Sequence, residues 1–151
     1  MAEVFKKSFH VRWGDTDANA HMRNTAYLDM AADVRMMYFQ DCGFSEPEFK
    51  GLRLGPIAMK DQLEYYREMK MLEPMDVTLE LAGISEDGSR FHFRNTFYRR
   101  DGAMAAQVTS ECGWLNLDLR RLAAPPEPLR MALIAISKTS DFKTLPSRVT
   151  G

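Results

Sequence analysis

The sequence predicts an α+β fold in which a five-stranded antiparallel sheet wraps around one long helix. Apolar residues recur at helical spacing over only one long stretch, residues 24–43. One strand-like segment precedes that stretch and four follow it, and the pairs Asp87-Gly88 and Asp101-Gly102 between them are typical of hairpin turns. Such a sheet must bury one face, and the helix is the only large apolar body that can cover it.

The first strand is predicted over residues 5–13, where apolar and polar side chains alternate. Its apolar face would consist of Phe5, Phe9, Val11 and Trp13. The helix over residues 24–43 would turn inward the side chains of Tyr27, Met30, Ala31, Val34, Met37 and Tyr38. Asn24 or Thr25 can cap the start of this helix, and Gly43 can end it.

The remaining strands follow a loop or short helical turn that begins at residue 44. They cover roughly residues 56–68, 75–81, 91–98 and 104–119. The prolines of the segment APPEPL then stop the sheet, because proline cannot donate a ladder hydrogen bond, and a short helix is predicted after them at 127–137. We therefore expect a single domain over residues 4–137 and a polar C-terminal tail over residues 138–151. The open edge of such a sheet favours dimerisation.

The composition excludes several classes of partner. A net charge of −1 gives no reason to expect nucleic acid. The longest apolar run, MALIAIS, is too short to span a bilayer, and the first thirteen residues lack the apolar segment of a signal peptide. Cys42 and Cys112 form no CxxC pattern and are predicted to be thiols, which suits a reducing compartment. We expect a cytoplasmic protein.

The polar stretch WGDTDANAHMRN lies between the first strand and the helix and admits three interpretations. Asp15, Asp17 and Asn19 match the first ligand positions of an EF-hand calcium loop. The match then fails, because Ala20 stands where the loop needs glycine and Ala26 where it needs a bidentate glutamate. No metal or cofactor is therefore expected.

The second interpretation is a plain strand-to-helix turn, since Asp and Asn accept local backbone hydrogen bonds. It does not explain why Asp17 and His21 fall four residues apart immediately before the helix. The third interpretation is catalytic. A helix N-terminus offers unpaired N–H groups to an oxyanion, and a carboxylate just upstream can attack a carbonyl or take a proton from water. The predicted chemistry is addition to the carbonyl of an ester or thioester.

The order of D-x-D, His, Asn and Tyr at a strand–helix junction, together with the segment YYREMKMLEPMDVTLEL, carries a family resemblance. Over roughly residues 4–130 the chain resembles the hotdog-fold acyl-CoA thioesterases of the 4-hydroxybenzoyl-CoA thioesterase-like family. The resemblance implies a hotdog fold, a homodimer or homotetramer, and hydrolysis of an acyl thioester of CoA or acyl-carrier protein. It also implies Asp17 as nucleophile or general base and the backbone amide near Asn24 as oxyanion donor. His21 would shape the site, and Asp15 would be structural.

Four further residues are candidates for substrate binding. Tyr27 completes the motif, and Glu64 lies on the second strand, where some hotdog enzymes carry a second acid. Arg90 and Arg94, beside Arg99 and Arg100, could meet CoA phosphates. The alternative for Glu64 and the arginines is that they are solvated strand residues with no role in substrate binding. One branch of the family has an acid on the helix that binds a phenol hydroxyl, and the corresponding position here is Ala32. The resemblance therefore implies an aliphatic or simple aryl acyl group.

Two other functions stay open at this point. Hotdog hydratases and dehydratases of 3-hydroxyacyl thioesters use an Asp–His pair, but their pattern D-x-N-P-x-H has a spacing of five and a proline that this chain lacks. A non-catalytic acyl-thioester binding protein is the other alternative, because a fold alone does not decide function.

Overall fold

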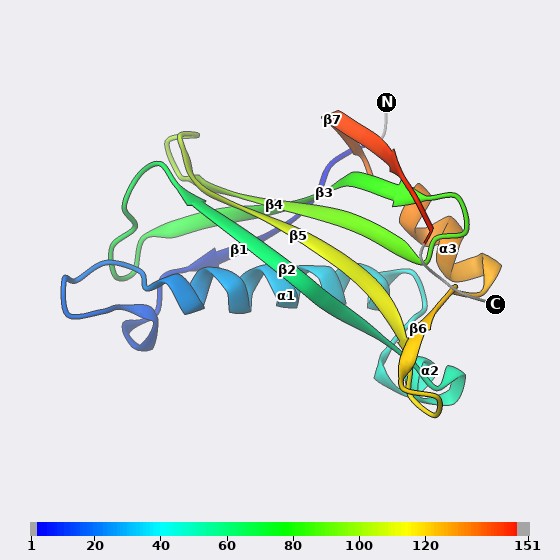
Figure 1. Ribbon diagram of the computed structural model, residues 1–151. Coiled ribbons are helices and arrows are strands. Elements are labelled where there is room, and N and C mark those ends of the chain that lie inside the picture. Colours follow the sequence, from blue (N-terminus) through cyan, green and yellow to red (C-terminus); the bar gives the residue numbers. More distant parts are fainter. Residues whose placement is uncertain (1–2, 148–151) are drawn as a thin grey trace.

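The computed structural model describes residues 3–147 and contains a curved sheet that packs on the helix α1 (Asn24–Asp41) (Figure 1). Five strands form the main path of the sheet, in the order β1-β3-β4-β5-β2, and all neighbours on this path are antiparallel. Their bounds are β1 (Phe5–His10), β2 (Leu54–Tyr65), β3 (Pro74–Ser85), β4 (Arg90–Arg99) and β5 (Met104–Asn116). This arrangement confirms the predicted antiparallel sheet packed on a helix.

The predicted count of five strands is too small. Residues 3–147 form seven strands and three α-helices. The elements beyond the five main strands and α1 are α2 (Glu46–Leu52), β6 (Arg121–Ala123), α3 (Glu127–Ile134) and β7 (Lys138–Leu145). Of these, α3 confirms the short helix predicted at 127–137, and α2 lies where a loop or short helical turn was predicted, whereas β6 and β7 were not predicted. β6 pairs with β5 at one end of the sheet, and the two short helices lie at the same end, far from the start of α1 (Figure 1).

The chain after residue 137, predicted as a polar tail, instead forms β7, which pairs in parallel with β3. β1 covers the edge of β3 only as far as Leu79, so the backbone groups from Leu81 to Ser85 remain open to a second strand. Backbone hydrogen bonds hold β7 against β3 at this edge, so the sequence of β7 need not be apolar. Residues 148–151 of the predicted tail lie outside the described residues.

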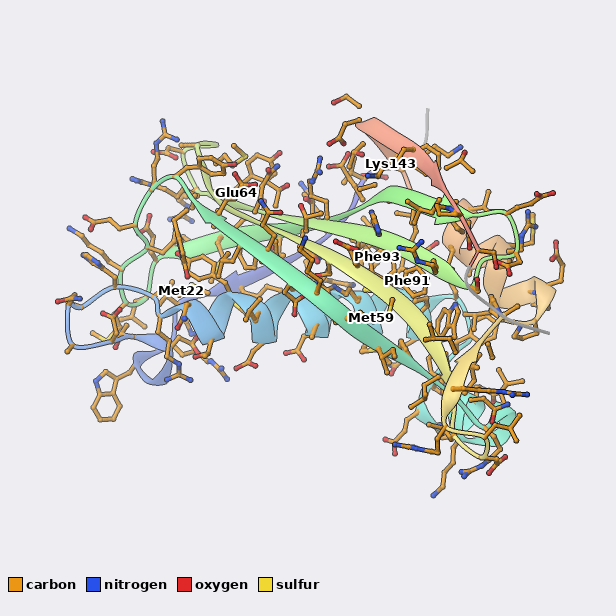
Figure 2. All side chains as sticks on the ribbon, in the orientation of Figure 1. Met22, Met59, Glu64, Phe91, Phe93 and Lys143 are labelled. Carbon is orange, nitrogen blue, oxygen red and sulfur yellow. The ribbon has the colours of Figure 1, made fainter. Side chains whose placement is uncertain are left out.

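The core lies between α1 and the concave face of the sheet. The buried residues of α1 are Ala26, Tyr27, Met30, Ala31, Val34 and Phe39, whereas Met37, predicted to face inward, is 37% exposed. Phe91 and Phe93 of β4 lie over the C-terminal half of the helix (Figure 2), where the rings of Phe93 and Phe39 are 6.0 Å apart. Gly43 follows the helix with φ +91, as predicted for a helix-ending glycine. The helix begins after Arg23, so neither Asn24 nor Thr25 occupies the capping position.

The first strand is shorter than its sequence pattern predicts. β1 ends at His10, and a 3-10 turn η1 (Trp13–Asp15) redirects the chain. The turn forms because the Asp15 carboxylate accepts the backbone N–H of Arg12. As a result the Trp13 indole, predicted on the buried face, is 82% exposed. Within residues 3–147 no helix is long and apolar enough to cross a bilayer.

Candidate active site

Asp15 anchors the loop that joins β1 to α1. Its side chain is buried and accepts three hydrogen bonds from Arg12: from the backbone N–H at 2.9 Å, from Nε at 3.0 Å and from Nη2 at 2.9 Å. Its carbonyl oxygen accepts the backbone N–H of Arg23 at 2.8 Å. The Arg12 guanidinium holds the pKa of Asp15 below its usual value, so the carboxylate stays charged and paired. The predicted structural role of Asp15 is confirmed.

The surroundings of Asp17 are different, although it follows Asp15 by only two positions. It is exposed, and Oδ1 accepts the backbone N–H groups of Asn19 at 2.9 Å and His21 at 3.2 Å. The turn is closed by the Asp17 N–H, which donates to the His21 carbonyl at 2.9 Å, and by Ala20, which adopts φ 62. Oδ2 has no hydrogen-bond partner in the described part of the chain. The backbone therefore orients this carboxylate and leaves one of its oxygens available.

A cavity of about 510 Å³ lies where the loop, the start of α1 and the end of β2 meet. Met22 marks this end of the molecule in Figure 2. The lining residues are Asp17, His21, Met22, Asn24, Tyr27, Tyr65, Tyr66, Arg67 and Glu68. The structure thus brings four predicted site residues, Asp17, His21, Asn24 and Tyr27, into one cavity.

The segment after β2 contributes a wall that the sequence analysis missed. His21 Nε2 lies 2.5 Å from Glu68 Oε2, and His21 forms a backbone bridge with Lys70. Tyr65, Tyr66 and Glu68 reach the site because β2 runs back toward the start of the helix, a long-range arrangement that leaves no local signal. Among residues 3–147 no group of three or more His, Cys, Asp or Glu side chains could hold a metal ion.

The first turn of α1 leaves one amide unpaired beside the cavity. The Thr25 N–H donates to Asn24 Oδ1 at 2.9 Å, and the Ala26 N–H donates to the Arg23 carbonyl at 3.1 Å. The Asn24 N–H has no acceptor in the part of the chain that the structure describes. A helix N-terminus also carries the positive end of the helix dipole. This amide can therefore donate to a carbonyl oxygen that gains negative charge.

Tyr27 forms the floor of the cavity. It is 2% exposed and packs edge-on against Phe97, with ring centroids 5.1 Å apart, and against Tyr65 at 5.6 Å. Burial raises the pKa of Tyr27 to about 12, so its hydroxyl remains protonated at neutral pH. The residue offers an apolar ring with a neutral hydroxyl to whatever occupies the cavity.

The other three predicted residues lie elsewhere. Glu64 is exposed near the end of β2 (Figure 2) and accepts a hydrogen bond from the Tyr66 hydroxyl at 3.3 Å. Arg90 is buried and donates to the Pro146 carbonyl at 3.0 Å. Arg94 makes a two-pronged ion pair with Asp141 of β7, at 2.9 and 3.0 Å. None of the three lines the Asp17 cavity.

Comparison with known proteins gives one family and a common fold. The profile of the thioesterase-like superfamily matches residues 11–133. No curated protein matches the sequence. A hypothetical protein from Staphylococcus aureus, solved in complex with CoA, is 22% identical with a TM-score of 0.82, covering 100% of this chain and 91% of that one.

Two thioesterases of known structure share the fold at lower identity. A 1,4-dihydroxy-2-naphthoyl-CoA thioesterase from Synechocystis is 14% identical with a TM-score of 0.77, covering 87% of this chain and 96% of that one. A gentisyl-coenzyme A thioesterase is 16% identical with a TM-score of 0.73, covering 85% and 98%. At these identities the likeness establishes the fold.

Proposed function

Because the chain belongs to the thioesterase-like superfamily and is a thioester hydrolase, we propose that it hydrolyses acyl-CoA thioesters with Asp17 as its catalytic carboxylate. The observation that carries this proposal is the pairing of two groups in one cavity. The oriented carboxylate of Asp17 and the unpaired amide of Asn24 both border it. A thioester carbonyl between them would meet a nucleophile or base on one side and an oxyanion donor on the other.

The proposed reaction adds water across the thioester bond. In the general-base route Asp17 takes a proton from water, and the water oxygen bonds to the carbonyl carbon. The Asn24 N–H stabilises the resulting oxyanion, which collapses and expels the CoA thiolate. The protonated Asp17 then returns the proton to the thiolate and is restored as a carboxylate. In the nucleophilic route an Asp17 oxygen bonds to the carbonyl carbon, the C–S bond breaks, and the CoA thiolate leaves, which gives a mixed anhydride. Water then cleaves the anhydride, which releases the acid, restores the Asp17 carboxylate and supplies a proton to the thiolate. His21, held by Glu68, keeps the Asp17 turn closed.

The proposed substrates are CoA thioesters of an aliphatic or simple aryl acid. The choice of CoA is supported by the relatives, since one is solved with CoA and two are named as CoA thioesterases. A thioester of acyl-carrier protein is the alternative carrier. The aromatic wall formed by Tyr27, Tyr65 and Tyr66 suits an apolar or flat portion of the substrate.

The proposed assembly is a homodimer or homotetramer. The outer edge of β2 pairs with no strand in residues 3–147, and Met59 on β2 is 46% exposed. Two copies can satisfy this edge by pairing their β2 strands antiparallel about a two-fold axis. Analytical sedimentation at assay concentrations is expected to give a dimer or tetramer, and a fully active monomer would contradict the assembly. The cytoplasm is the proposed location, in keeping with cysteines that form no disulfide.

The test of function is a panel of acyl-CoA thioesters of several chain lengths, with and without an aryl group, followed by the appearance of free thiol. Thiol release that depends on the enzyme supports the proposal. Interconversion of enoyl and 3-hydroxyacyl thioesters without thiol release would identify a hydratase. Saturable binding without either reaction would identify a binding protein, and both of these outcomes would overturn the proposed hydrolysis.

A further inference from the structure

A second, smaller cavity lies beside the C-terminal half of α1, away from Asp17. Its volume is about 150 Å³, and Met36, Phe39, Ile57, Phe91 and Phe93 supply most of its walls. Phe91 and Phe93 are labelled in Figure 2, above the helix. Arg35 is the one charged residue among those that line it. An otherwise apolar cavity of this size fits the end of a short or flat organic group.

The Arg35 guanidinium is only partly satisfied. Nε donates to Asn95 Oδ1 at 3.1 Å, and Nη2 donates to Ser110 Oγ at 2.5 Å. Ser110 in turn donates to Asp61 Oδ1 at 2.5 Å, so Asp61 acts on Arg35 through an intervening hydroxyl. Across residues 3–147 Arg35 has no direct ion pair, and Nη1 has no acceptor. Burial lowers the pKa of Arg35, although the nearby Asp61 acts in the opposite direction.

A purely structural role accounts for the hydrogen bonds of Nε and Nη2, but it does not account for the unpaired Nη1. The bonds from Nε and Nη2 tie the helix to β4 and β5, and a guanidinium has no other way to bind than by donating. Arg35 is only partly buried, and Nη1 is not among the fully buried atoms that lack a partner, so this nitrogen is accessible to an occupant of the cavity. An occupant that presents acceptor oxygens to Nη1 and Nη2 would complete the hydrogen bonding of the guanidinium. A carboxylate matches the guanidinium best, because it can accept two parallel N–H bonds.

Within one subunit this cavity is far from the proposed reaction centre. Arg35 follows Asn24 by eleven residues, or roughly 16 Å along the helix. The proposed dimer changes this relation. Antiparallel pairing of two β2 strands places the Tyr65 end of one strand opposite the Leu54 end of the other. Tyr65 borders the Asp17 cavity, and Pro56 and Ile57 border the Arg35 cavity, so the two cavities of different subunits become neighbours.

We propose that Arg35 of the partner subunit binds a carboxylate at the distal end of the acyl group. The preferred substrates are then CoA thioesters of short aliphatic or aryl dicarboxylic acids. This inference rests on the proposed thioesterase activity and on the proposed dimer. It specifies that the distal end of the acyl group carries a carboxylate, and it makes Arg35 a specificity-determining residue.

The first test compares substrates that differ only at the far end of the acyl group, with the wild-type enzyme. One pair is 4-carboxybenzoyl-CoA and 4-isopropylbenzoyl-CoA, and the other is glutaryl-CoA and 5-methylhexanoyl-CoA. In each pair an isopropyl group replaces the carboxylate with nearly the same shape. At least one carboxylated member is expected to have the higher kcat/KM by about tenfold or more, because a site built to donate hydrogen bonds rejects an analogue that cannot accept them.

The second test removes the charge. Arg35→Met keeps much of the side-chain length and cannot donate, so it is expected to abolish or reverse the preference, with turnover of the isopropyl substrates retained. Arg35→Lys keeps the charge without the two-pronged geometry and is expected to retain part of the preference. Arg121→Met makes the same chemical change at an exposed residue that lines neither cavity, and is expected to leave the preference unchanged.

The outcomes separate this inference from the proposed function. Hydrolysis of the apolar thioesters without any preference for the carboxylated partners overturns the role of Arg35 and leaves thioester hydrolysis intact. A preference that survives in Arg35→Met, or a higher kcat/KM for 4-hydroxybenzoyl-CoA than for 4-carboxybenzoyl-CoA, also overturns it. Absence of thiol release from every substrate overturns the proposed function itself. Because the wild-type comparison comes first, failure of a variant to fold does not remove the test.

Discussion

The two ends of the central helix α1 are built in opposite ways. At its start lie an exposed carboxylate, an unpaired amide and an open cavity of about 510 Å³. At its end Phe39 is fully buried among aromatic rings, with centroids 5.5 Å from Trp114, 5.7 Å from Phe49 and 6.0 Å from Phe93. The first end is open and polar, whereas the second is packed mainly with aromatic side chains, and Arg35 is the one charged residue that lines its small cavity.

This contrast indicates where the stability of the domain comes from. Buried aromatic side chains contribute large apolar areas and specific ring contacts, so the far end of the helix holds the sheet and helix together. The near end can then leave Asp17 in solvent, because its loop is fixed by Asp15 and by the backbone bonds of the turn. Stability is unevenly distributed in folded proteins, and functional groups are found in the less packed regions.

The largest effect is expected from Trp114, at the packed end. It is fully buried and its indole N–H donates to the Gly88 carbonyl at 3.2 Å. Trp114→Ala should lower the free energy of unfolding by about 3–5 kcal/mol, from lost burial and the cavity left behind. Urea unfolding measures this. Trp114→Phe, which refills most of the space, is the milder control. An alanine variant as stable as the wild type would contradict the assignment of stability to this end.

Asp17→Asn tests the open end. Thiol release should fall by roughly a hundredfold or more, the scale of losing a positioned base or nucleophile. The unfolding midpoint should hardly change, because the carboxamide oxygen can still accept the Asn19 and His21 amides. Steady-state kinetics and thermal unfolding on the same preparation separate the two effects. Retention of most of the activity would show that Asp17 is not the catalytic carboxylate.

Asp15→Asn should act on stability, in contrast to the substitution two residues later. Replacing the charged acceptor of these partly buried hydrogen bonds by a carboxamide is expected to cost about 1–3 kcal/mol at neutral pH. The pKa of Asp15 is lowered in the folded state by Arg12, so the folded protein binds this proton less readily than the unfolded chain. The stabilisation is therefore present above the ordinary pKa of about 3.9 and is lost as pH falls through the folded value.

The pH dependence gives this prediction its check. Unfolding free energies of wild type and Asp15→Asn, measured from neutral to acidic pH, should differ by a constant amount at first and then converge below about pH 4. A difference that stays constant in acid would mean that the ion pair with Arg12 is not the source of the stabilisation.

The sequence predicts those parts of the fold that carry a local period. The alternation of Met75, Val77 and Leu79 lies within β3, and the helical spacing from Asn24 lies within α1. β7 has no such signal, because the polar segment Lys138–Leu145 is ordered by pairing with an open edge of β3 rather than by its own pattern. Trp13 continues the alternation of β1 but is exposed, since the Asp15 turn ends the strand first.

The candidate site also has one part that the local sequence predicts and another part that depends on long-range pairing. Asp17, His21 and Asn24 are close in sequence and on one strand–helix junction, so their meeting could be predicted. Glu68 joins them only through the course of β2 across the sheet. Arg35 did offer a local signal, because it follows the buried Ala31 by one helical turn and so interrupts the apolar face with a cation.

The smallest effect is expected from Trp13, which makes a matched comparison with Trp114. Trp13 is 82% exposed, and its carbonyl oxygen accepts hydrogen bonds from the Thr16 N–H at 3.2 Å and the Thr16 hydroxyl at 2.8 Å. Trp13→Ala keeps both bonds, so its unfolding free energy should stay within about 0.5 kcal/mol of wild type. Urea unfolding beside Trp114→Ala measures the contrast directly. A loss above about 1 kcal/mol would mean that another surface, such as a second copy of the chain, covers the indole, and the open end of the helix would then be less open than one subunit indicates.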